Sequence, residues 1–120
     1  MKKRVVIVGA SADPAKFGNK SVRAHLRQNW EVIPINPKGG QIEGLTVRKS
    51  LRDVTGPVER VSLYLPPDLG ILELPNILAL QPAEFFVNPG AESDELIEEA
   101  RRIGLDPIIA CSIVAIGERP

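Results

Sequence analysis

A loop of small residues is the first segment of this chain whose residue types suit ligand chemistry. It begins with Gly9, Ala10 and Ser11 after a β-branched run, and it closes with Phe17, Gly18, Asn19 and Lys20 before a helical pattern. Small residues in such a loop let phosphate groups approach the backbone N–H groups and the N-terminus of the next helix. The two glycines stand too far apart for a G-x-G-x-x-G turn. We predict phosphate binding here, and a sharp strand-to-helix turn without a ligand is the alternative.

The second loop of interest follows the next apolar run and reads Asn36, Pro37, Lys38 and two glycines. A domain that binds NAD usually carries a carboxylate at this point, where it holds the ribose hydroxyls. This chain carries the cation of Lys38 instead. The loop therefore argues against NAD and favours a ligand with an extra phosphate on its ribose, such as NADP or coenzyme A. An ordinary surface turn with a solvated lysine is the alternative.

Two further turns follow apolar runs. Leu65, Pro66 and Pro67 form a stiff segment that lacks two backbone donors. It is either a simple rigid turn or an apolar wall against an adenine or a pantetheine arm.

The second of these turns contains Asn88, Gly90, Ala91 and Glu92. The amide side chain of Asn88 can donate and accept hydrogen bonds, and the turn leads into a capped helix.

The single cysteine, Cys111, ends the last apolar run and has no histidine near it in sequence. A small buried hydrophobe is its commoner role. The only histidine, His25, lies in a helical pattern beside Val22 and Leu26, so we expect a half-buried structural side chain. The sequence contains no serine elbow, no Walker A motif and no clustered metal ligands, and nothing in it assembles an acid, a base and a nucleophile. We therefore predict no catalytic residue and no metal site.

Alternating patterns predict the elements that position these loops. The predicted strands are Arg4–Val8, Glu31–Ile35, Glu59–Leu65, Ala83–Val87 and Asp106–Ala110. The predicted helices are Lys20–Asn29, Lys49–Val54, Asp68–Leu80 with Pro75 as a kink or restart, and a last one from the N-cap Ser93 to the C-cap Gly104. Strands that alternate with helices predict an α/β fold: a Rossmann-like, doubly wound parallel sheet of about five strands with helices on both faces. Ligands of such folds bind at the carboxyl ends of the strands, where all of these loops lie.

Composition sets further limits. The chain of 120 residues suits one domain, 1–120, and no apolar run approaches the length of a membrane helix. Its net charge is zero, yet residues 1–60 carry about +7 and residues 61–120 about −7. The positive half holds the loops described first, which suits an anionic small ligand, whereas nucleic-acid binding is disfavoured. A single cysteine and the absence of a signal-peptide pattern predict a cytoplasmic protein.

Taken together, the loops resemble a known family. The pattern comprises Val8 to Ser11, Gly18 to Lys20, Ile35 to Lys38, Gly44, Leu65 to Pro67, Asn88 to Ser93 and Cys111. It is similar to the stand-alone CoA-binding domain proteins, which are themselves similar to the CoA-binding domain of the succinyl-CoA synthetase alpha subunit. The resemblance implies coenzyme A as ligand. It places the diphosphate and ribose near the first loop and Lys38, the two prolines beside the nucleotide, and the turn from Asn88 to Ala91 near the arm.

Three functions remain open at this point. The first is a protein that binds coenzyme A or acyl-CoA without its own catalytic centre, as a carrier, sensor or regulatory partner. The second is a component of a CoA- or NADP-dependent enzyme that a partner chain completes, with Cys111 or Glu92 as candidate groups. The third is an interaction protein that kept the fold and lost the ligand. The apolar stretch from Ser112 to Gly117 is a candidate surface for self-association.

Overall fold

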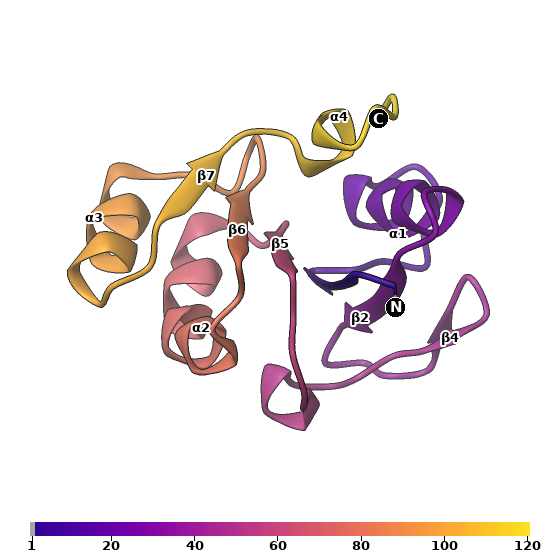
Figure 1. Ribbon diagram of the computed structural model, residues 1–120, viewed down its shortest axis with the longest axis horizontal. Coiled ribbons are helices and arrows are strands. Elements are labelled where there is room, and N and C mark those ends of the chain that lie inside the picture. Colours follow the sequence, from indigo (N-terminus) through magenta and orange to yellow (C-terminus); the bar gives the residue numbers. More distant parts are fainter. Residues whose placement is uncertain (1) are drawn as a thin grey trace.

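A five-stranded parallel sheet forms the centre of the computed structural model, which describes residues 2–120 (Figure 1). Met1, part of the predicted domain, lies outside the described residues. The strands lie in the order β2-β1-β5-β6-β7, and every neighbouring pair is parallel. Their bounds are β1 Arg4–Val8, β2 Glu31–Ile35, β5 Arg60–Leu63, β6 Glu84–Val87 and β7 Pro107–Ile109. The Rossmann-like α/β fold predicted from the alternating patterns is confirmed.

Helices cover both faces of this sheet (Figure 1). On one face α2 (Pro67–Leu80) and α3 (Asp94–Arg102) pack on a core that includes Leu74, Leu96 and Leu63. On the other face α1 (Phe17–Arg27) packs through Val22 against Ile7, and α4 (Ser112–Ala115) lies beside it. The remaining elements are a hairpin of β3 (Gln41–Ile42) and β4 (Leu45–Thr46) and the 3-10 turn η1 (Leu51–Asp53). Because both faces are covered, β1, β2 and β6 are apolar after a charged first residue, as is typical of buried parallel strands, whereas β5 includes the buried polar residues Arg60 and Ser62.

The structure corrects several predicted boundaries. Helix α1 begins at Phe17, three residues before the predicted start at Lys20, because Gly18 and Asn19 are buried within its first turn. Helix α2 begins at Pro67 with Pro66 as its N-cap, and it runs through Pro75 without a restart. The predicted helix Lys49–Val54 is only a 3-10 turn. In the last helix Ser93 caps as predicted, with Oγ accepting a hydrogen bond from the Leu96 N–H at 3.0 Å.

The C-terminal stretch that the sequence offered as a self-association surface folds back onto the protein. Ile113 of α4 is fully buried, and Glu118 pairs with Arg27 at the end of α1. Val114 alone among the large side chains of this turn stays well exposed, at 59%. Within residues 2–120 no helix is long and apolar enough to cross a membrane.

A buried amide joins three elements beneath the carboxyl ends of the strands. Asn88 is 1% exposed, and its Nδ2 donates to Ser62 Oγ at 2.8 Å and to the Leu63 carbonyl at 2.9 Å. Its Oδ1 accepts from the Ser112 N–H at 2.8 Å. Ser112 Oγ in turn lies 2.7 Å from Ser62 Oγ and 3.1 Å from the Tyr64 hydroxyl. Asn88 thus fixes the end of β6 to β5 and to the start of α4.

A second buried polar group lies between α1 and the sheet. His25 is completely buried, more than the half-burial expected, and its Nδ1 lies 2.8 Å from the Ser21 carbonyl. Its Nε2 lies 3.4 Å from Arg60 Nη1. An arginine only donates, so Nε2 accepts and Nδ1 carries the proton. Burial, with a smaller contribution from the Arg60 charge, lowers the pKa of His25 to about 4.

We predict that Asn88→Ala lowers the free energy of unfolding by about 2–4 kcal/mol, because Ser112 N–H and Ser62 Oγ lose a buried partner. Urea denaturation measures this change. Asn76→Ala is the control: Asn76 is half-buried and its side chain bonds only Glu73 of its own helix, so its change should stay within about 1 kcal/mol. Equal effects of the two substitutions would contradict the structural role of Asn88.

We predict that the stability of the protein falls between pH 6.5 and pH 4 through His25. The unfolded histidine gains its proton near pH 6.5, whereas the folded one gains it only near pH 4. Stability is therefore complete above pH 6.5, and about 3 kcal/mol is lost as the pH falls to 4. The difference in unfolding free energy between the wild type and His25→Gln, measured by urea denaturation across this range, isolates the effect. A difference that stays constant with pH would refute it.

Candidate functional site

A cleft opens at the carboxyl ends of β1, β2, β5 and β6. Its volume is about 420 Å³. The loop after β1 and the first turn of α1 form one wall, and the turns after β5 and β6 form the other. The lining residues are Gly9, Ala10, Ser11, Lys16, Phe17, Gly18, Asn36, Lys38, Tyr64, Leu65, Pro89 and Gly90. We call this the central cleft.

Two glycines allow close packing at the end of β1: Gly18 lets α1 approach β1, and Gly9 lies against the turn after β5. Gly9 has φ +90°, and a Cβ at this position would lie 3.1 Å from the Tyr64 carbonyl carbon. A Cβ on Gly18 would overlap the Gly9 carbonyl oxygen. Larger residues at either position would therefore move the helix away from the strand, or would strain the backbone.

The N-terminus of α1 has no capping side chain, and the nearest carboxylates bond other groups: Glu43 Oε2 accepts from Asn19 Nδ2 at 3.2 Å and Asp13 Oδ1 from the Ala15 N–H at 3.0 Å. The N-cap residue of α1, Lys16, makes no side-chain capping bond, and no acidic residue occupies the first turn. Helix α3 differs, because Ser93 caps it and two acidic residues lie in its first turn. The first N–H groups of a helix have no partner within the helix, and they carry the positive end of the macrodipole. With Lys16 and Lys38 on the same cleft, this end of α1 suits an anionic ligand group.

Amide side chains hold the loops on both sides of that helix end. Asn36 Nδ2 donates to the Ala10 carbonyl at 2.9 Å, and its Oδ1 accepts from the Lys38 N–H at 2.9 Å. Asn19 Nδ2 donates to the Ser11 carbonyl at 2.9 Å. These bonds fix the backbone of the β1 loop and leave the Lys38 side chain exposed. A neighbouring hollow of about 330 Å³ continues the cleft past Ser11, Lys16 and Lys38.

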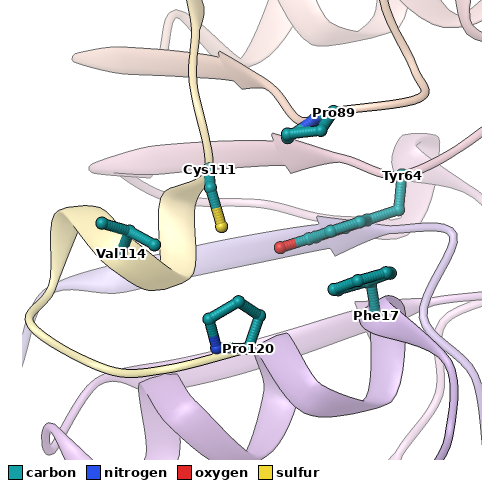
Figure 2. Close-up of a pocket in the computed structure, with 6 residues that line it drawn as sticks. All are labelled: Phe17, Tyr64, Pro89, Cys111, Val114 and Pro120. Carbon is teal, nitrogen blue, oxygen red and sulfur yellow. The ribbon is translucent and has the colours of Figure 1, made fainter.

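An apolar pocket of about 240 Å³ adjoins one end of the central cleft, and Figure 2 shows its walls. Its lining consists of Phe17, Tyr64, Pro89, Cys111, Val114 and Pro120. The Cys111 thiol and the Tyr64 hydroxyl point toward one another across it (Figure 2). Burial raises the pKa of Tyr64, whose hydroxyl is hydrogen-bonded to Ser112. We call this the thiol pocket.

Another hollow, of about 200 Å³, lies on the other side of Gly9, between the turns after β2 and β5. Its walls are mostly apolar, with three polar side chains at the edge. The lining residues are Val8, Gly9, Ile35, Pro37, Lys49, Ser50, Leu65, Leu69, Leu72 and Glu73. Leu69 and Leu72 are exposed large hydrophobic residues of α2. We call this the outer pocket.

The structure brings most of the predicted site residues to these three hollows. Nine of them line the central cleft, namely Gly9, Ala10, Ser11, Phe17, Gly18, Asn36, Lys38, Leu65 and Gly90. Pro37 lines the outer pocket and Cys111 the thiol pocket.

The other predicted site residues lie elsewhere. Asn19, Asn88 and Ala91 are buried in the protein, where the two amides hold loops. Pro66 and Pro67 begin α2 and line none of the three hollows, and Lys20 Nζ lies over the Phe17 ring at 4.9 Å from its centroid.

Two residues that line the central cleft, Lys16 and Tyr64, were missed by the sequence reasoning, and Pro89 was included only as part of the turn from Asn88 to Ala91. Each stands directly beside a residue that was chosen, so the strand-end rule contained the signal for them. Glu92, a candidate catalytic group, instead accepts a hydrogen bond from the Gly90 N–H at 2.8 Å and stabilises its own turn. Within residues 2–120 no group of three or more His, Cys, Asp and Glu side chains is placed to hold a metal ion.

Comparisons with known proteins show the family of this chain. The family model described as "CoA binding domain" matches residues 3–117. The uncharacterized protein YneT of Bacillus subtilis is 25% identical over 112 residues, which cover 87% of this chain and 80% of YneT.

Solved structures share the fold. A conserved hypothetical protein from Pyrococcus furiosus is 30% identical with a TM-score of 0.84, and the match covers 96% of this chain and 99% of that one. The dinucleotide-forming acetyl-coenzyme A synthetase 1 of Ca. Korarchaeum cryptofilum has a TM-score of 0.76 at 24% identity, over 90% of this chain and 25% of that chain. At that identity the likeness shows the fold of one part of a larger protein. Since the family model spans nearly the whole sequence, the chain belongs to the CoA-binding domain family.

Proposed function

We propose that this protein binds coenzyme A and has no catalytic centre of its own. The single observation that carries the proposal is the order of the three hollows along the strand ends: an apolar pocket, a cationic cleft over a free helix N-terminus, and a second apolar pocket. Coenzyme A has the same order of parts: an adenine, a diphosphate and a pantetheine arm.

In this proposal the diphosphate of coenzyme A binds over the first turn of α1. Phosphate groups bind backbone N–H groups at helix N-termini, and this turn has neither a capping side chain nor an acid. Lys16 supplies a positive charge beside it. Gly9 and Gly18 allow the approach, because a side chain at either position would displace the helix or the strand.

In this proposal the adenosine of coenzyme A binds in the outer pocket. Leu65, Leu69 and Pro37 offer apolar contact to a flat base, while Lys49 lies at the edge. Lys38 faces the central cleft on the side of the β2 turn, where it can pair with a phosphate on the ribose. NAD lacks that phosphate, so the lysine favours coenzyme A over NAD.

The arm then runs past Tyr64 and Pro89, which line both the central cleft and the thiol pocket. The sulfur end reaches the neighbourhood of Cys111. Among the side chains that line the cleft, none has a nearby proton acceptor that would activate it as a nucleophile, which favours a binding role over catalysis. We therefore propose a carrier, sensor or regulatory partner, and we propose that it works in the cytoplasm.

We predict that Lys38→Ala weakens coenzyme A binding about tenfold, because one charge-assisted phosphate contact is lost. The same substitution should abolish the preference for coenzyme A over dephospho-CoA. Calorimetric titration with both ligands, and with NADP and NAD, measures these affinities at fixed salt. Lys2→Ala is the matched control, because Lys2 precedes β1 at the opposite end of the sheet and should leave both affinities unchanged.

Two results would contradict the proposal. Absence of binding by coenzyme A would leave the loops without a ligand and favour an interaction protein. NADP binding as tight as coenzyme A binding would favour a component of an NADP-dependent enzyme.

A further inference from the structure

The thiol pocket continues from the central cleft toward the chain after β7. Three of its residues, Phe17, Tyr64 and Pro89, also line the central cleft. The other three, Cys111, Val114 and Pro120, belong to the chain after β7. Figure 2 shows α4 and the C-terminal residue enclosing the side away from the cleft. A ligand that leaves the cleft toward Tyr64 therefore enters a space closed by the C-terminal segment.

The walls of this space are apolar. Proline, valine and phenylalanine side chains form most of it, and the Tyr64 hydroxyl is already paired with Ser112 Oγ at 3.1 Å. Water gains few hydrogen bonds in such a space, and apolar groups gain free energy by replacing it. A polar or charged acyl group would lose its hydration there without a new partner.

The pocket has a limited size. Its volume of about 240 Å³ corresponds to about eight groups of the size of water, at about 30 Å³ each. That suffices for the sulfur end of the arm and a short aliphatic chain. It does not suffice for the whole of a fatty acyl chain.

From these observations, and resting on the proposed function, we propose that the thiol pocket binds the acyl group of a short aliphatic acyl-CoA. The thioester lies beside Tyr64 and Cys111, and the acyl carbons extend between Phe17, Val114 and Pro120. The preferred ligand is an acyl-CoA with an uncharged chain of about four carbons, and succinyl-type chains with a terminal carboxylate are disfavoured.

Calorimetric titration of the wild type with CoA, acetyl-CoA, butyryl-CoA, octanoyl-CoA and succinyl-CoA tests this. Each buried methylene contributes about 0.8 kcal/mol, so butyryl-CoA should bind about tenfold more tightly than acetyl-CoA. The four further carbons of octanoyl-CoA should add less than about threefold in total, because they extend beyond the pocket. Succinyl-CoA should bind more weakly than butyryl-CoA.

A pair of variants on α4 tests whether the acyl group binds in the thiol pocket. Val114→Trp fills the pocket and should reduce the ratio of butyryl-CoA to CoA affinity to about one. Ala115→Trp places the same ring on the next residue, which is exposed and does not line the pocket, and it should keep the wild-type ratio. Far-UV circular dichroism shows that each variant is folded.

The outcomes separate the two proposals. If CoA binds and affinity is independent of the acyl group, or if Val114→Trp keeps the wild-type ratio, the acyl pocket is refuted and the proposed function stands. If CoA and all its thioesters fail to bind, both are refuted.

Discussion

The contact between the first turn of α1 and the end of β1 determines the arrangement of the whole binding edge. Gly18 lies so close to the Gly9 carbonyl that no side chain fits between them. This contact holds the free N-terminus of the helix directly over the strand ends, where the central cleft opens. Any residue larger than glycine would widen the gap and carry the N–H groups away from Lys38 and from the turn after β6. The proposed phosphate site thus depends on close packing between a helix and a strand, which requires glycine at position 18.

Three buried or half-buried amides then fix the loops around that contact. Asn19 holds the Ser11 carbonyl, Asn36 holds the Ala10 carbonyl, and Asn88 holds β5, β6 and the start of α4. The backbone polar groups of these turns are therefore satisfied by side chains of the protein, so the loops keep their shape without a ligand. Such preorganisation lowers the entropy that binding must overcome. It also explains why asparagine follows two of the strands.

The sequence sufficed for the fold, and it was less informative about the role of each residue. Alternating apolar runs predicted five parallel strands, and the strand-end rule led to the edge of the sheet at which the central cleft opens. The start of α1 was misplaced because Gly18 and Asn19 are poor helix formers by local propensity, and only their packing against the β1 loop makes them helical. Asn88 was chosen as a ligand contact because an amide after a strand has the right chemistry for one. Its burial depends on Ser62 and Ser112, which are distant in sequence, and a local pattern does not reveal such contacts.

The C-terminal segment is a second case in which contacts between residues distant in sequence decide the structure. Its apolar residues suggested a candidate surface for a second copy, and in the structure Ile113 is buried against the same protein, Val114 stays exposed, and Glu118 bonds Arg27 and Gln28 at the end of α1. Folding back in this way closes the thiol pocket and brings Pro120, the last residue, opposite Phe17 (Figure 2). The pocket is therefore built from residues that are spread along the chain from Phe17 to Pro120, and only the tertiary structure brings them together.

A crystal structure of the protein with coenzyme A tests the central claim most directly. The account predicts the diphosphate oxygens at about 3 Å from the backbone nitrogens of the first turn of α1, with the sulfur beside Cys111. A diphosphate bound away from that turn, or an arm that leaves the cleft without approaching Tyr64, would contradict it.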